Sequence, residues 1–197
     1  MKHMFLVLSL FFSLQAYAGI LGNSLFFEPY IAYKVENTKL TDLLNNTSEI
    51  KTTAPSLGIK IGFRSMAGVD LNLYAEITQG KAEITNFNEP NNFSKKTAGA
   101  ELGVNSLGII KMYLGTSISN DFTIEKSDQT QAFTVSGPSF HTGLLFKAIP
   151  FVNLGLQYNL NQYNTIKGDA YIADEKLETY YSKVDTQDYS VYISSTF

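Results

Sequence analysis

The chain has 197 residues, enough for one domain, and its 15 basic and 18 acidic side chains leave a net charge of −3. No basic cluster exceeds the pair Lys95-Lys96, which argues against nucleic acid as a partner. The absence of cysteine excludes disulfides and a lipid-modified N-terminal cysteine.

The N-terminus has the pattern of a secretory signal peptide. A basic start at Lys2 precedes an apolar run over 4–14, and Ala16-Tyr17-Ala18 forms an A-x-A cleavage site. The alternative is an anchor helix, but the apolar run is too short to span a bilayer. We therefore predict a signal peptide over 1–18 and one mature domain over 19–197. No later segment is apolar enough for a transmembrane helix, so entry into a membrane would require a closed barrel.

Eight segments alternate apolar and polar residues at period two, which predicts β-strands with two different faces. They span 27–35, 57–63, 69–77, 98–104, 110–118, 140–146, 152–160 and 180–197. Polar, irregular stretches over 37–54, 81–96, 120–131 and 167–178 alternate with short turns such as 65–68. This rhythm predicts an all-β fold, namely a transmembrane antiparallel up-and-down barrel with short periplasmic turns, long extracellular loops and both termini in the periplasm. A soluble β-sandwich is the alternative, although its connections need not alternate in length.

The outward face of the predicted strands carries no charge, as a bilayer requires, because one lysine at the midplane would cost roughly 2–4 kcal/mol. Tyr33, Tyr158 and Tyr163 are expected toward the outer strand ends. The inward face carries five acidic and five basic residues, namely Glu28, Lys34, Lys60, Arg64, Asp70, Glu76, Glu101, Lys111, Lys147 and Asp188.

An eight-stranded barrel has an interior just wide enough for side chains, and unpaired ions there would be costly. We therefore interpret the ten inward charges as a structural ion network, with a conduction path or gate as the alternative. A symmetric turn at 65–68 would place Arg64 opposite Asp70 and Lys60 diagonal to Glu76. Across the next hairpin, Glu101 would lie diagonal to Lys111.

Catalysis has one candidate centre. His141 is the only histidine after residue 18 and has inward parity, and Ser139 lies on the same face, with Glu101 or Asp188 as a candidate acid. Barrels that modify lipid A open their sites toward the lipid, whereas His141 points inward, so we expect no enzyme. No metal-ligand spacing or phosphate-binding loop is present, and we expect no cofactor.

The outer loops contain the residues available for recognition. Seven lysines are placed at this end, where lipopolysaccharide phosphates would lie: Lys39, Lys51, Lys95, Lys96, Lys126, Lys167 and Lys176. Acidic residues are interspersed, so a mixed solvated surface is the alternative.

The last strand ends in Phe197, with Val191 and Ile193 on the same face. Together with the signal peptide and eight strands, it resembles the small outer-membrane barrels, such as the OmpA transmembrane domain, OmpX and the opacity-like proteins, with OmpW-like barrels as second choice. The resemblance implies an assembly signal at Val191, Ile193 and Phe197 read by the barrel assembly machinery, although Ser195 departs from the usual apolar residue. It also implies an outer-membrane monomer in contact with lipid or lipopolysaccharide.

Two function classes follow. The first is a non-catalytic barrel with a side-chain-plugged lumen, serving envelope integrity or surface interaction and adhesion through its loops. The second is a narrow channel or carrier for a small solute, either polar or hydrophobic. The sequence does not identify an extracellular ligand.

Overall fold

The structure is a computed structural model that describes residues 24–85, 89–106, 108–128, 130–149, 152–168 and 175–197. The predicted signal peptide over 1–18 lies outside the described residues. Within them, no helix is both long and apolar enough to cross a membrane.

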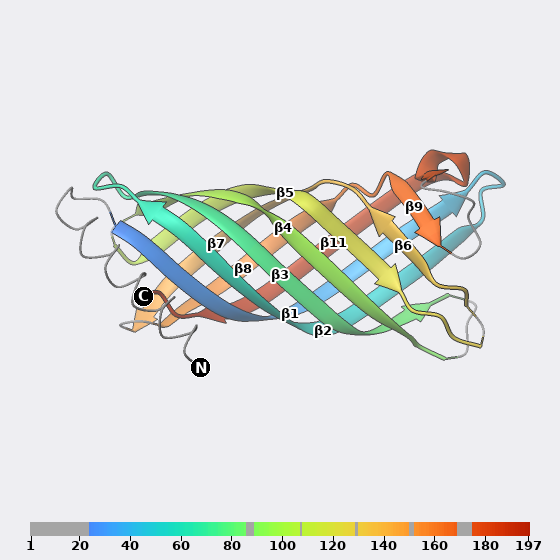
Figure 1. The fold of residues 1–197 in the computed structure, drawn as a ribbon, viewed down its shortest axis with the longest axis horizontal. Coiled ribbons are helices and arrows are strands. Elements are labelled where there is room, and N and C mark those ends of the chain that lie inside the picture. The colour runs from blue at the N-terminus through green and yellow to red at the C-terminus, as the bar shows by residue number, and fades with distance from the viewer. Residues whose placement is uncertain (1–23, 86–88, 107, 129, 150–151, 169–174) are drawn as a thin grey trace, which may run out of the picture.

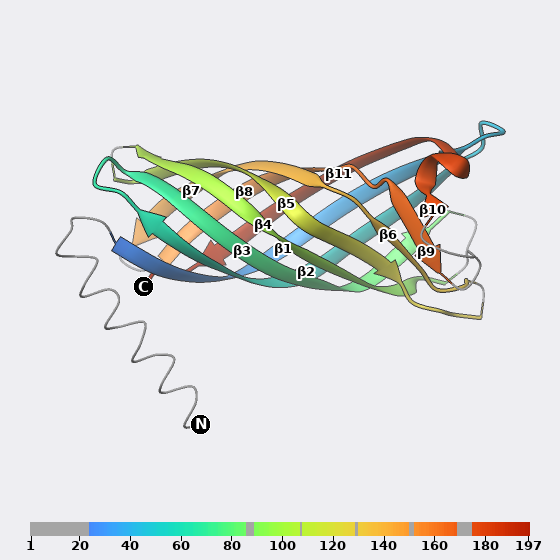
Figure 2. The same cartoon turned by 45° about the horizontal axis from the view of Figure 1, so that its top comes forward.

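Long antiparallel strands form one tilted sheet (Figures 1 and 2). Eight of them form the barrel: β1 (Ser24–Asp42), β2 (Thr47–Arg64), β3 (Val69–Ile84), β4 (Asn91–Ser106), β5 (Ile110–Ile124), β7 (Ser139–Ile149), β8 (Val152–Asn161) and β11 (Tyr181–Ser194). Three short strands extend one side of the wall: β6 (Phe133–Ser136), β9 (Thr165–Gly168) and β10 (Glu175–Lys176). A 3-10 turn, η1 (Leu177–Thr179), leads from β10 toward β11.

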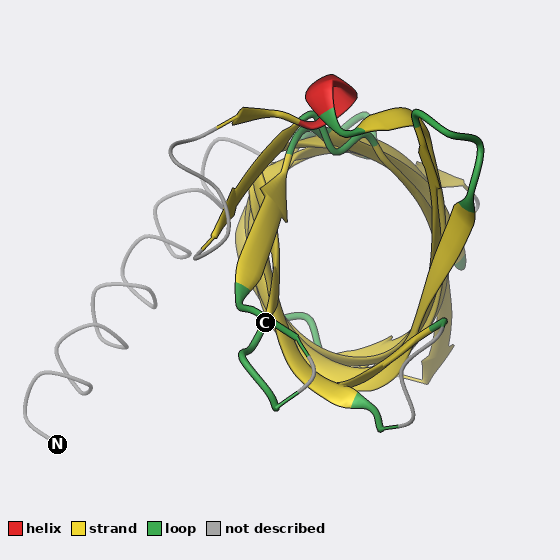
Figure 3. Cartoon of the chain, turned by 90° about the vertical axis from the view of Figure 1, so that its right-hand side faces the viewer, coloured by secondary structure: helices red, strands yellow, loops and turns green. Residues whose placement is uncertain are grey.

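The sheet closes on itself, as the ring in Figure 3 shows. β1 pairs with both β2 and β11, and β5 pairs with both β4 and β7. The ladder continues past β11, because the N–H of Phe27 donates to the carbonyl of Phe197 at 3.0 Å and the reciprocal bond is 2.9 Å long. Closure satisfies the backbone groups that a sheet edge would expose to lipid.

The predicted fold class, an all-antiparallel eight-stranded barrel, is confirmed. The start of β1 and the C-terminus lie at the same end as the turns that join β2 to β3 and β4 to β5 (Figure 1). The turn at 65–68 closes with Gly68 at φ +77°, a conformation that suits glycine.

The strands extend much further than the sequence analysis placed them. Most of the first polar stretch, 37–54, is not irregular, because β1 continues to Asp42 and β2 begins at Thr47. β1 has 19 residues, whereas a membrane-spanning strand needs about 9–11. The hairpins therefore project well beyond the apolar band.

The two faces of the wall exchange polarity along the barrel. In the half that contains the start of β1 and the C-terminus, here called the membrane half, the outward residues are apolar, as in Ile31 and Leu73. The inward residues of this half are polar. In the projecting half, exposed lysines such as Lys39 and Lys51 face outward. The inward residues there form an apolar core of Leu40, Ile50, Ala54, Ala82, Phe93, Phe122, Ile124, Val135, Tyr163, Ile166 and Leu177. The projecting half is thus built like a water-soluble barrel, and this reversal explains why the sequence pattern predicts loops in place of its strands.

Candidate functional site

Charged side chains cross the lumen in a connected series. Arg64 on β2 binds Asp70 on β3 through two hydrogen bonds of 2.8 and 3.0 Å. Lys111 on β5 lies 3.1 Å from Asp70 and 3.6 Å from Glu101 on β4. Glu101 also receives Lys60 of β2 at 2.8 Å. Five ionic side chains from four strands are therefore joined within the barrel.

Lys60 occupies a cage of aromatic rings. Its Nζ lies 4.4 Å from the ring centroid of Tyr113, 5.2 Å from that of Tyr192 and 5.6 Å from that of Tyr30. Such contacts stabilise a desolvated ammonium. The rings fit because each covers a glycine of a neighbouring strand: a Cβ at Gly58 would lie 2.1 Å from the Tyr30 ring.

A second ionic cluster lies nearer the projecting half. Lys95 Nζ contacts Glu36 at 2.5 Å and Asp188 at 3.1 Å, and the Tyr163 hydroxyl donates to Glu36 at 2.9 Å. Lys34 pairs with Glu76, which also accepts a 3.0 Å hydrogen bond from Tyr30.

Two sequence-based placements are corrected here. Lys95, expected among the lysines at the outer surface, is buried, and Tyr163, expected among the outer aromatic residues, lies in the apolar core. The physical reason is parity. Lys95 continues the inward series of Gly99 and Glu101 on β4, and Tyr163 continues that of Asn161 beyond β8. Extending the alternation past the predicted strand ends would have located Lys95, Tyr163 and Glu36.

The remaining predicted charges are placed differently. Glu28 is 1% exposed, and neither of its carboxylate oxygens has a hydrogen-bond partner among the described residues. Lys147 is half-buried and makes no ion pair within the described part of the chain. Lys60 contacts Glu101 rather than the diagonal Glu76, because the curved wall brings β2 and β4 together across the interior.

The candidate catalytic residues do not form a triad. The Ser139 hydroxyl donates to Ser117 at 2.9 Å, and both Ser139 and His141 are buried. His141 Nε2 lies 3.5 Å from Glu101, and the imidazole packs edge-on against Tyr74 at 5.0 Å between ring centroids. His141 is thus a packed lumen residue. The described residues contain no group of acidic and histidine side chains that could hold a metal.

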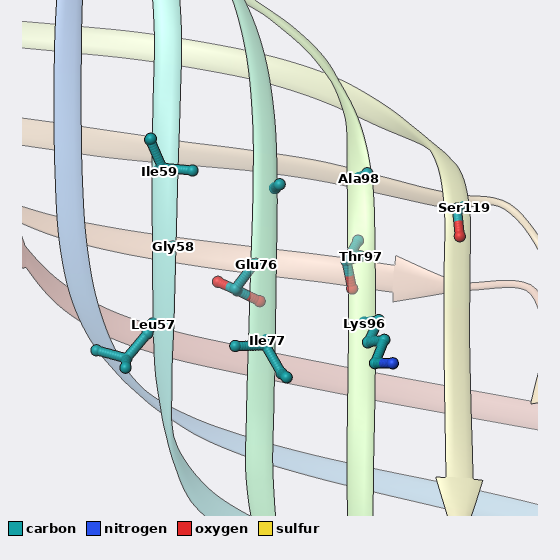
Figure 4. Close-up of a pocket in the computed structure, with 10 residues that line it drawn as sticks. Leu57, Gly58, Ile59, Glu76, Ile77, Lys96, Thr97, Ala98 and Ser119 are labelled. Carbon is teal, nitrogen blue, oxygen red and sulfur yellow. The ribbon is translucent and has the colours of Figure 1, made fainter. Parts of the chain in front are cut away.

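The described residues of the barrel wall line a cleft and a groove. A cleft of about 530 Å³ separates the region after β8 from the start of β11, and residues around Tyr163, Leu177 and Val184 line it. A groove of about 520 Å³ crosses β2, β3 and β4 and reaches β5 on the outward face, with Leu57, Ile77 and Lys96 among its lining residues (Figure 4).

No family model matches the chain, and no curated protein sequence matches it. Solved structures resemble its fold. Ail, the attachment invasion locus protein of Yersinia pestis, solved with the heparin analogue sucrose octasulfate, is 13% identical, with 88% of this chain and 99% of that chain covered and a TM-score of 0.56. Neisserial surface protein A is 17% identical (89% and 99% covered, TM-score 0.50). The outer membrane protein AlkL, studied in lipid bilayers, is 11% identical (89% and 90% covered, TM-score 0.51).

These likenesses define the class by its fold. The chain has the closed eight-stranded architecture of the small outer-membrane barrels, the general group that the sequence pattern resembles. They do not single out the OmpA, OmpX or opacity-like branch.

Proposed function

We propose that this protein is a non-catalytic integral outer-membrane barrel, that side chains plug its lumen, and that it serves envelope integrity or surface interaction through its projecting hairpins. The supporting observation is the ionic series from Arg64 to Lys60, which crosses an interior that is just wide enough for side chains. The aromatic cage around Lys60 occupies more of the same cross-section.

The projecting half supports the surface role. Its strands are held by an apolar core and by polar outward faces, so the hairpin tip at 43–46 is presented on a rigid support. Leu43 and Leu44 are exposed at that tip. A role in attachment is compatible with the likeness to Ail, and it requires the long hairpins to face outside and both termini to face the periplasm.

The terminal strand supports a further part of the proposal. Val191, Ile193 and Phe197 are all exposed on the outward face, where an assembly machine could read them. Since β1 and β11 already pair within one chain, we propose a monomer in contact with outer-membrane lipid.

Planar-bilayer recording tests the plug. We expect the mature protein to give no steady conductance, whereas a Lys60→Ser/Glu101→Ser variant opens small, steady conductance because it removes the central ion pair. A Lys39→Ser/Glu49→Ser variant, which removes an exposed ion pair, is the matched control. Steady ion-conducting pores in the unmodified protein would overturn the proposal.

The cleft beside β11 favours a second candidate, passage of a small hydrophobic solute. The pairing of β11 with β8 stops at Asp188 and Asn159, while β11 continues to Tyr181 along β1. The wall is therefore parted where the cleft lies. Uptake of a hydrophobic fluorophore into proteoliposomes tests this candidate. Val184→Trp should reduce the uptake, whereas Lys51→Trp, at an exposed position on β2 that does not line the cleft, should not. Uptake equal to that of protein-free liposomes would dismiss it.

A further inference from the structure

The outward groove over β2–β5 has a defined shape. Cross-strand pairing places Leu57, Ile77 and Lys96 in one row, and Ile59, Ala75 and Ala98 in the next row toward the turn at 65–68. Figure 4 shows Lys96 beside Ile77, with Ala98 further along the strand of Lys96 and Ser119 on the next strand. The small side chains of Ala75 and Ala98 leave a hollow, which is bounded by the branched apolar side chains of Leu57, Ile59 and Ile77.

A β-bulge lies at the edge of the groove. Ala98 pairs with Ser119 and Gly99 pairs with Ser117, so Ile118 is left without a partner and is 86% exposed. A bulge bends its strand and increases the local twist. Gly99 is required here because a Cβ would lie 2.1 Å from the carbonyl oxygen of Thr116. The hollow is thus a consequence of backbone geometry as well as of small side chains.

The groove carries a charge at its outer end. Lys96 is exposed and makes no ion pair among the described residues, unlike Lys39 and Lys51, which both contact Glu49. Its cross-strand neighbour Asp121 instead accepts a 3.1 Å hydrogen bond from Ser119. An apolar hollow that ends in an ammonium without an ion pair among the described residues complements an acyl chain with an anionic headgroup.

We propose that this groove binds one acyl chain of lipid A, the phosphorylated lipid of lipopolysaccharide, with a lipid A phosphate at Lys96. This inference rests on the proposed placement in the outer membrane with the hairpins outward, because only then does the row of Leu57, Ile77 and Lys96 meet the outer leaflet. The membrane half supplies the apolar surface, and the row that contains Lys96 marks the level at which outward residues become polar. Attraction between a juxtamembrane lysine and anionic lipid is worth about fivefold in affinity.

Native mass spectrometry of the folded mature protein, with diphosphoryl lipid A added in detergent, tests the site. We expect one retained lipid A adduct, weaker by about fivefold in Lys96→Gln and lost in Ala98→Phe, which fills the hollow. Matched controls are Lys126→Gln, an exposed lysine outside the groove, and Ala100→Phe, the next outward position on β4. Heat-dependent gel mobility confirms that each variant is folded.

Several outcomes would overturn the inference. Equal losses in Ala98→Phe and Ala100→Phe would indicate unspecific lipid contact, and equal retention of phosphatidylglycerol would remove the preference for lipid A. A cross-linked dimer through position 98 would assign the groove to a second copy. The conductance experiment is independent of this one. A barrel that neither conducts nor retains lipid A would contradict only the lipid A site, whereas a barrel that conducts and retains lipid A would contradict only the plugged lumen.

Discussion

Glu101 is the residue on which most contacts of the lumen converge. Its carboxylate meets Lys60 at 2.8 Å, Lys111 at 3.6 Å and the amide of Asn72 at 2.8 Å, and it lies 3.5 Å from His141. Its side chain is 1% exposed. Removing it would leave two buried ammonium groups without a partner that they now share.

We expect Glu101→Leu to lower the free energy of unfolding by about 3–5 kcal/mol, the usual cost of removing one partner from a buried ion pair. The double variant Lys60→Met/Glu101→Leu should recover part of that loss, because one uncompensated charge is removed with the carboxylate. Urea unfolding in lipid vesicles measures both, and Lys126→Met is an exposed control that should not change stability. A single variant as stable as the unmodified protein would show that the network does not stabilise the barrel.

At the scale of the element, the β1–β2 hairpin shows how a projecting loop is made rigid. Asp42 accepts hydrogen bonds of 2.8 Å from the N–H groups of Leu44 and Asn46, and the side chain of Asn46 donates to it at 2.9 Å. Asn45 adopts φ +66° at the tip, a conformation that asparagine tolerates better than most residues. The sequence pattern predicts this region only as part of a polar, irregular stretch.

The hairpin tip should loosen in acid. The side chain of Asn46, followed by backbone N–H groups, lowers the pKa of Asp42 below its ordinary value. A carboxyl whose folded pKa is depressed stabilises the fold above its unfolded pKa, near 3.9, and loses that contribution as the pH falls through the folded pKa. NMR should therefore show loss of amide protection at Leu44 and Asn46 below about pH 4. Asp42→Ala should lack that protection already at neutral pH, and protection unaffected by the variant would contradict the expectation.

At the scale of the whole molecule, closure depends on the pairing of the first and last strands. Phe27 and Phe197 exchange two backbone hydrogen bonds, while the Phe197 side chain is 61% exposed. The backbone therefore closes the barrel, and the exposed ring is free for recognition. These two roles can be separated experimentally.

We expect Phe197→Ala to refold in vesicles to the same heat-modifiable form as the unmodified protein, because the backbone pairing does not require the ring. In cells the same variant should insert into the outer membrane at a reduced level, measured by fractionation and heat-dependent gel mobility. Ile149→Ala, another exposed apolar residue in the described barrel, is the control. Unchanged insertion of Phe197→Ala would remove the proposed assembly signal.

The alternation of residues along the chain is sufficient to predict the class of fold and the direction of the side chains in the membrane half. Strict alternation puts Ile31 outside and Glu28 inside whatever the neighbouring strand is, because side chains of a strand alternate between its faces. The tight turn at 65–68 similarly determined the register in which Arg64 meets Asp70. These are local properties, and they can be read from adjacent residues.

Which charges meet across the barrel, and which polar segments are strands, depends on how distant strands pack together. Lys60 reaches Glu101, and Lys95 reaches Asp188, because stagger and curvature place distant strands face to face. The strand segments of the projecting half were not predicted, because their apolar residues, such as Leu40 and Phe93, point into the barrel rather than outward. The alternation is the same in both halves, but the solvent around the barrel changes, and a sequence pattern does not state where the membrane ends.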